Sequence, residues 1–116
     1  MQVTILGSGT PIPEPKRAGT SLALKIGGEQ VLIDCGPGAF SRLLEENIHP
    51  ADVTDLFFTH QHMDHNASFF EFAIVSWRLG RQSLTVYGPE GTEALLDSLE
   101  TIYEEDIEYR KSLGGE

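Results

Sequence analysis

The sequence contains a single cysteine, few basic residues and no long apolar run, and each shortage excludes a class of protein. Because Cys35 is alone, no disulfide can form within the chain, which excludes a disulfide-stapled secreted scaffold and favours a reducing compartment. No basic segment followed by an apolar core opens the chain, and no uninterrupted apolar stretch approaches membrane-spanning length. We therefore expect a cytoplasmic protein that makes no use of a membrane.

Basic side chains are also scarce. The sequence has 8 Lys and Arg and 18 Asp and Glu, which gives a formal net charge of −10. Half of the acidic residues lie in 90–116, which reads as the solvated face of a helix and a tail. Electrostatic capture of nucleic acid depends on Lys and Arg contacts to phosphate. A nucleic-acid substrate would therefore need positive potential from a metal, or from polypeptide outside this sequence.

The pattern of apolar residues predicts strands alternating with helices. Gly27-Gly28 separates two alternating segments and indicates a β-hairpin. Strands are predicted at 2–6, 20–26, 30–34, 55–59 and 84–87. Helices are predicted at 40–48, at 69–79 and from Thr92 onward, where Thr92 would be the N-cap. We expect a layered α/β arrangement in which helices cover a sheet.

Three of the four histidines lie within six positions, and an aspartate accompanies them: His60, His62, Asp64 and His65. His60 and His62 are two residues apart, so in extended or tight-loop backbone both rings can reach one cation. Asp64 and His65 are adjacent and suit a second cation. Imidazole and carboxylate ligands match zinc, manganese or iron, and the absence of thiolates argues against a closed structural zinc site.

Two such cations, about 3.5–4 Å apart, could share a hydroxide nucleophile and hold both oxygens of a hydrolysed bond. The alternative is a surface loop rich in histidine with incidental metal affinity. The apolar run 56–58, which reads as a buried strand leading directly into the cluster, favours the catalytic interpretation.

The segment 60–65, His-Gln-His-Met-Asp-His, resembles the HxHxDH signature of the metallo-β-lactamase fold superfamily of metal-dependent hydrolases. Further similarity lies in 5–11, 32–38, 53–60 and 84–91. The set is most similar to the ribonuclease Z branch, which cleaves phosphodiester bonds in RNA precursors, and to hydrolases grouped with arylsulfatases. The resemblance implies a four-layer αββα sandwich, of which 1–116 would be the N-terminal part of a single domain.

The resemblance also implies roles for individual residues. His60 and His62 would bind one divalent ion, and Asp64 and His65 the other; zinc is the first expectation, with manganese and iron as alternatives. Asp64 would also be catalytic, by moving a proton toward the leaving oxygen. Asp34 would not bind metal itself but would brace the histidines that do, and capping of the turn at 36–38 is an equally good interpretation of it.

Three departures from the ribonuclease Z pattern limit what the resemblance implies. The loop 13–18 has Pro15 and Ala18 where Lys and Asn are expected, and 66–70 lacks a Gly-Leu-Pro-Gly segment; both argue against tRNA as the substrate. No histidine follows His65, so the remaining ligands of such a site are absent from this sequence. The chain therefore resembles the N-terminal half of a longer hydrolase.

The leading hypothesis is a hydrolase of phosphodiester bonds, acting on RNA or on a small-molecule ester. A hydrolase of sulfate esters, lactones or cyclic nucleotides on the same scaffold is the second hypothesis. The third is a catalytically inactive fragment that binds metal or a partner. A half-fold would leave a sheet face and edge uncovered, and a homo-oligomer is then one possible outcome.

Other polar residues are predicted to be structural. The segment 7–10 could cradle a phosphate with its amides, but a tight turn is the favoured interpretation. Cys35 is expected to be a small packed residue rather than a nucleophile. His49, before Pro50, is expected to be exposed.

Overall fold

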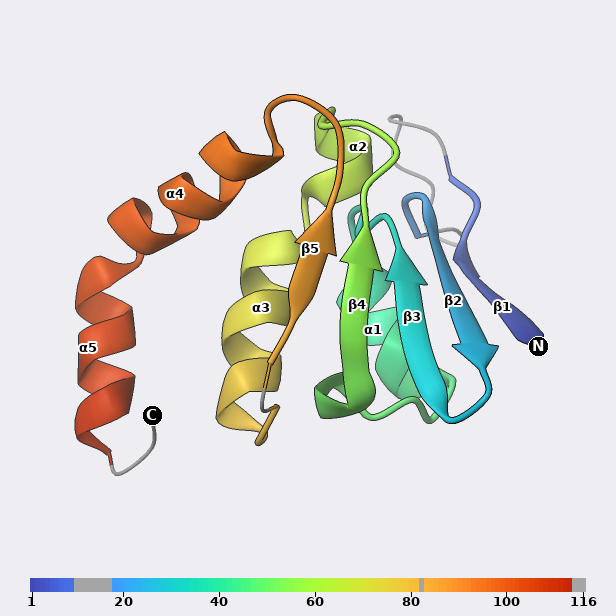
Figure 1. Ribbon diagram of the computed structural model, residues 1–116, viewed down its shortest axis with the longest axis horizontal. Coiled ribbons are helices and arrows are strands. Elements are labelled where there is room, and N and C mark those ends of the chain that lie inside the picture. The colour runs from blue at the N-terminus through green and yellow to red at the C-terminus, as the bar shows by residue number, and fades with distance from the viewer. Residues whose placement is uncertain (10–17, 82, 114–116) are drawn as a thin grey trace.

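The five strands form one mixed sheet, in the order β1-β2-β3-β4-β5 (Figure 1). The computed structural model describes residues 1–9, 18–81 and 83–113. β1 (Gln2–Gly7), β2 (Ser21–Ile26) and β3 (Glu29–Ile33) are antiparallel neighbours. β4 (Val53–Phe57) and β5 (Thr85–Tyr87) then continue the sheet parallel to β3. The carboxyl ends of β3, β4 and β5 consequently lie at the same edge, which is the upper edge in Figure 1.

The helices lie on one side of this sheet. α1 (Ala39–Glu45) and α3 (Phe69–Arg78) lie behind the strands in Figure 1. α2 (Met63–Asn66) is a single turn above β4, and η1 (Pro50–Asp52) is a 3₁₀ turn that leads into β4. α4 (Thr92–Ile102) and α5 (Glu104–Ser112) leave the upper end of β5 and run down the far side of α3 (Figure 1).

The core lies between the sheet and α1 with α3. Ala23, Leu32 and Leu56 come from neighbouring strands, point to the same face and are at most 1% exposed. Leu43 of α1 and Phe72 of α3 pack against them and are fully buried. The apolar side chains that alternate along the strands thus pack in one layer against those that recur with helical periodicity in α1 and α3.

The opposite face of the sheet carries exposed apolar side chains. Val3 and Ile5 of β1 are 53% and 66% exposed, and Phe57 stacks on Tyr87 with ring centroids 4.3 Å apart. No helix or strand of the described part of the chain covers this face (Figure 1). The predicted layered α/β arrangement is confirmed; the described residues form one helical layer and one sheet of it.

Several predicted boundaries are wrong. β4 begins at Val53 and ends at Phe57, and the C-terminal helical segment is divided at Tyr103 into α4 and α5. Thr92 is not the N-cap of α4: Gly91, in a left-handed conformation with φ 100°, takes that place. Glycine adopts this conformation without steric cost, which lets the chain turn sharply out of β5. The Thr92 hydroxyl instead donates to the Pro89 carbonyl at 2.8 Å.

Two smaller predictions concern parts of the chain away from the core. His49 is exposed as predicted, and its Nδ1 accepts a hydrogen bond from the Ala51 amide. The predicted loop 13–18 lies almost entirely outside the described residues. No helix in the described part of the chain is both long and apolar enough to cross a membrane.

Candidate metal site

The residues predicted to bind metal lie at the edge where the parallel strands end. Asp34 directly follows β3, and the histidine loop (residues 60–65) follows β4. The turn at 88–91 follows β5 at the same edge. The carboxyl edge of parallel strands is the usual place for a ligand site in sheets of this kind.

The structure brings the four predicted ligands together. The ring centroids of His60 and His65 are 3.7 Å apart, and those of His60 and His62 are 4.5 Å apart. His65 Nε2 lies 3.4 Å from a carboxylate oxygen of Asp64. Met63–Asn66 form α2, so Asp64 and His65 stand on a helical turn, whereas His62, just before it, has extended backbone.

Asp34 joins the histidine loop to β3. It is 1% exposed, and its Oδ1 accepts the Thr59 amide at 2.8 Å. Its Oδ2 accepts the Thr59 hydroxyl at 2.7 Å and lies 2.8 Å from His65 Nδ1. When Nδ1–H donates to this carboxylate, the Nε2 lone pair of His65 is free, as a metal ligand requires.

The contact that a bracing role for Asp34 requires is therefore present, although the role itself stays a prediction. The turn at 36–38 is closed in another way: the Gly36 amide donates to the Thr20 carbonyl, and the Ala39 amide donates to the Gly36 carbonyl. Among the described residues, the Asp34 carboxylate bonds to Thr59 and His65 rather than to this turn.

Backbone contacts hold α2 against the segment that follows β3. The Cys35 amide donates to the His65 carbonyl at 2.7 Å, and the Ser68 amide donates to the Cys35 carbonyl at 3.0 Å. A Cβ on Gly36 would lie only 2.4 Å from the Asp64 carbonyl oxygen. Glycine at position 36 therefore permits a backbone approach that no other residue allows.

Cys35 is a packed side chain, as predicted. It is 0% exposed, and burial, followed by the nearby carboxylates of Glu71 and Asp34, raises the pKa of its thiol. A thiol that stays protonated at neutral pH is a poor nucleophile and a poor metal ligand.

The side chains of the histidine loop are of the types that bind divalent ions, but they are not arranged around a common point as the ligands of an ion would be. Imidazole and carboxylate are ligands of zinc, manganese and iron. Within residues 1–9, 18–81 and 83–113, however, no group of three or more His, Cys, Asp and Glu side chains is placed so that it could hold an ion. The metal-binding roles of His60, His62, Asp64 and His65 therefore remain predictions.

Sequence reasoning missed three side chains that hold the histidine loop: Thr59, Gln61 and Thr92. Thr59 bonds Asp34, and Gln61 Nε2 donates to the Thr92 hydroxyl at 3.0 Å. Thr59 and Gln61 stand beside predicted ligands in the sequence, which is only a weak signal. Their partners lie 25 and 31 residues away along the chain, and no local pattern reveals such contacts.

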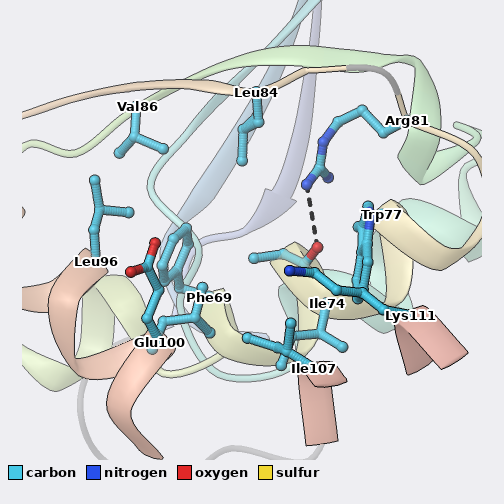
Figure 2. Close-up of a pocket in the computed structure, with 12 residues that line it drawn as sticks. Phe69, Ile74, Trp77, Arg81, Leu84, Val86, Leu96, Glu100, Ile107 and Lys111 are labelled. Carbon is cyan, nitrogen blue, oxygen red and sulfur yellow. Dashed lines mark hydrogen bonds between the residues drawn. The ribbon is translucent and has the colours of Figure 1, made fainter. Parts of the chain in front are cut away.

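An apolar cavity of about 340 Å³ lies apart from these residues, between α3, β5 and the α4–α5 pair (Figure 2). Phe69, Trp77 and Leu96 are among its lining residues. Arg81 reaches into it and donates to the Ala73 carbonyl at 3.1 Å, and burial lowers the pKa of this guanidinium. No member of the histidine loop lines the cavity.

Comparison with known proteins identifies the family of this chain. A model of the family described as "Anti-Pycsar protein Apyc1" matches residues 1–112, which is nearly the whole chain. The chain belongs to the Apyc1 family. The chain is 36% identical over 114 residues to ribonuclease Z of Mycobacterium marinum. This match covers 95% of the chain and 41% of the ribonuclease.

Solved structures place this Apyc1-family chain in the metallo-β-lactamase fold. The short form of human tRNase Z superposes with a TM-score of 0.81 at 30% identity, over 90% of this chain and 40% of the human protein. A diphosphatase of the PhnP family gives 0.69 at 25% identity, over 90% and 47%. The predicted fold and its ribonuclease Z-like character are confirmed. The chain spans about two-fifths of the length of the curated relatives that it matches.

Proposed function

We propose that this chain supplies part of the metal centre of a hydrolase that cleaves phosphodiester bonds. The observation that carries the proposal is the bond between Asp34 and His65 at 2.8 Å, beside the clustered rings of His60 and His62. A buried carboxylate that orients an imidazole is the arrangement typical of metal-binding histidines. The relationship to ribonuclease Z supports the choice of a phosphodiester bond.

The residues divide the chemistry between them. His60 and His62 would hold one ion, and Asp64 with His65 the other. Bound divalent ions make water nucleophilic near neutral pH and stabilise negative charge that develops on phosphoryl oxygens. Asp34 and Thr59 would keep His65 in one orientation and one tautomer. The carboxyl group of Asp64, 17% exposed, would pass a proton to the leaving oxygen.

Four ligands do not complete a two-metal site. No histidine follows His65, and the chain covers 41% of its Mycobacterium marinum relative. We propose that 1–116 is the N-terminal part of a single domain, and that further polypeptide supplies the remaining ligands. The exposed apolar face around Val3, Ile5 and Phe57 supports this, because a second sheet would remove that face from water.

RNA and cyclic nucleotides are the two candidate substrate classes, and both contain the proposed bond. Similarity to ribonuclease Z favours an RNA precursor. Membership of the Apyc1 family, whose proteins degrade cyclic nucleotides, favours a cyclic nucleotide. The net charge of −10 also favours the smaller substrate, because a long polyanion would be repelled by the surface of this chain.

The test is hydrolysis of both substrates by the complete gene product. We expect the wild-type protein to cleave one of the two substrates. His62→Ala and removal of metal by a chelator should each abolish that cleavage, and added divalent ions should restore the activity of the chelated protein. His49→Ala, which removes a histidine outside the loop, is the matched control and should keep full activity. Full activity of the His62→Ala protein would contradict the proposal.

Reading the coding DNA beyond Glu116 separates the enzyme from a protein of another class. An open frame that contains further histidines and aspartates supports a hydrolase assembled on one chain. A stop codon at that point supports an inactive metal-binding or interaction protein, or a site that is completed by a second chain.

A further inference from the structure

We propose that Gln61 is a positioning residue that holds His60 and His62 on one side of the histidine loop by fastening the loop to the start of α4. The inference rests on the proposed function, since it assigns a role in the same metal centre. Gln61 lies between two predicted ligands and is itself no ligand. Its side chain bonds both to Asn66, at the end of α2, and to Thr92, at the start of α4 and 31 residues away in the chain.

The hydrogen bonds around Gln61 form a chain with one consistent direction. Asn66 Nδ2, at the end of α2, donates to Gln61 Oε1 at 2.9 Å. Gln61 Nε2 donates to the Thr92 hydroxyl at 3.0 Å, and that hydroxyl donates to the Pro89 carbonyl at 2.8 Å. Because the hydroxyl proton of Thr92 is used on Pro89, its oxygen must accept from Gln61. Both ends of the Gln61 amide are thus satisfied in only one orientation.

The packing around this chain of bonds is close. Thr92 is 8% exposed. A Cβ on Gly88 would lie 2.3 Å from the Thr92 hydroxyl oxygen and 3.2 Å from Phe58 Cβ, so glycine at position 88 lets α4 begin directly beside the end of β4. Gly91 lies next to the Gln61 side chain, because a Cβ there would be 3.6 Å from Gln61 Cγ.

Fixing Gln61 also fixes its neighbours. The backbone at His62 is extended, with φ −83° and ψ 154°, and in extended backbone successive side chains point to opposite sides. His60 and His62 flank Gln61 in the chain, and their ring centroids lie 4.5 Å apart. A fixed Gln61 side chain restrains the backbone that carries both rings. The Gln61 side chain therefore pre-organises two imidazoles for one cation.

The test measures zinc affinity of the 116-residue chain by competition with a chromophoric chelator. Gln61→Leu removes both polar ends of the side chain at similar size. We expect roughly tenfold weaker zinc binding, which is the smaller of the losses in metal affinity that are typical when a residue that orients a metal ligand is replaced. Thr92→Val should weaken binding in the same direction, and Thr92→Ser should restore it. Gln30→Leu is the matched control: it removes a hydrogen bond to the Leu24 carbonyl at the other end of the sheet and should leave zinc affinity unchanged.

Coupling between the two residues gives a sharper outcome. If Gln61 acts through Thr92, the double variant should bind zinc no more weakly than Gln61→Leu alone. Multiplied effects of the two substitutions would overturn the proposal, and so would wild-type affinity in Gln61→Leu.

Amide hydrogen exchange without metal supplies an independent arm. In Gln61→Leu, exchange should become faster in both 59–66 and 88–95 and stay unchanged in β2 and β3; unchanged exchange in the first two segments would overturn the link. If the wild-type chain binds no zinc at all, the metal site of the proposed function fails, and the positioning role fails with it. If the wild-type chain binds zinc and Gln61→Leu binds it equally well, only the role of Gln61 fails.

Discussion

Replacing Asp34 by alanine should destabilise the chain more than any exposed carboxylate substitution. Asp34 accepts hydrogen bonds from the Thr59 amide and the Thr59 hydroxyl, and a third from His65 Nδ1. Thr59 is exposed, so water can replace part of what is lost, and we count about 1 kcal/mol for each of its two bonds. The bond to His65, which is only 14% exposed, contributes about 1.5 kcal/mol.

Backbone conformation adds a further cost. Asp34 has φ 60°, a left-handed conformation that Asp and Asn tolerate and that costs alanine about 1 kcal/mol. Together these contributions predict a loss of about 4.5 kcal/mol for Asp34→Ala, a large share of the roughly 5–15 kcal/mol that stabilises a domain. Asp34→Asn keeps the conformation and the bond from the Thr59 amide, and should lose about 1–2 kcal/mol.

The assay is urea unfolding followed by the fluorescence of Trp77, the one tryptophan in the sequence. Asp97→Ala, on the exposed side of α4, is the control and should stay within about 0.5 kcal/mol of wild type. The reasoning is refuted if Asp34→Ala is also within that margin, or if asparagine is tolerated no better than alanine.

Three further perturbations test other parts of the structure. The buried Cys35 thiol, with its raised pKa, should resist a thiol reagent in the folded chain and react fully in urea; rapid reaction without denaturant would contradict its packing. Gly36→Ala should lower stability by about 1–3 kcal/mol in thermal unfolding, since its Cβ would meet the Asp64 carbonyl, whereas Gly28→Ala, with nothing within 4 Å, should have little effect. The hydrogen bond to Asp55 raises the pKa of Tyr87, so this contact favours the fold below pH about 10 and loses its effect as the phenol ionises above that. Asp55→Asn should lower the pKa of Tyr87, as measured by ultraviolet absorbance against pH, and an unchanged value would exclude the contact in solution.

The sheet could largely be predicted from the sequence, because its signals are local. Gly27-Gly28 marks the turn between β2 and β3, and alternation places Ala23 and Leu32 on one face. The cluster of His60, His62 and His65 is equally visible, because three ligand-type residues share one short segment. Each of these features depends on neighbours in the sequence.

Features that depend on distant neighbours could not be predicted. The turn of α2 is held by bonds from Cys35 and Ser68, and the histidine loop is fastened by Gln61 to Thr92. The assignment of Thr92 as the N-cap was wrong because Gly91, in left-handed backbone, begins α4 and leaves the Thr92 hydroxyl to serve the contact with Gln61. In the contact between Cys35 and α2, and in the contact between Gln61 and Thr92, the two partners lie about 30 residues or more apart in the chain.

Zinc binding followed by NMR on the four histidine side chains shows directly whether the histidine loop holds a metal ion. His60, His62 and His65 lie in the proposed site, whereas His49 is exposed on a distant turn and serves as an internal reference. We expect that added zinc shifts the imidazole signals of His60, His62 and His65 and leaves His49 unchanged, with the shifts reversed by a chelator. Signals of the three loop histidines that do not respond to excess zinc, or a response confined to His49, would contradict it.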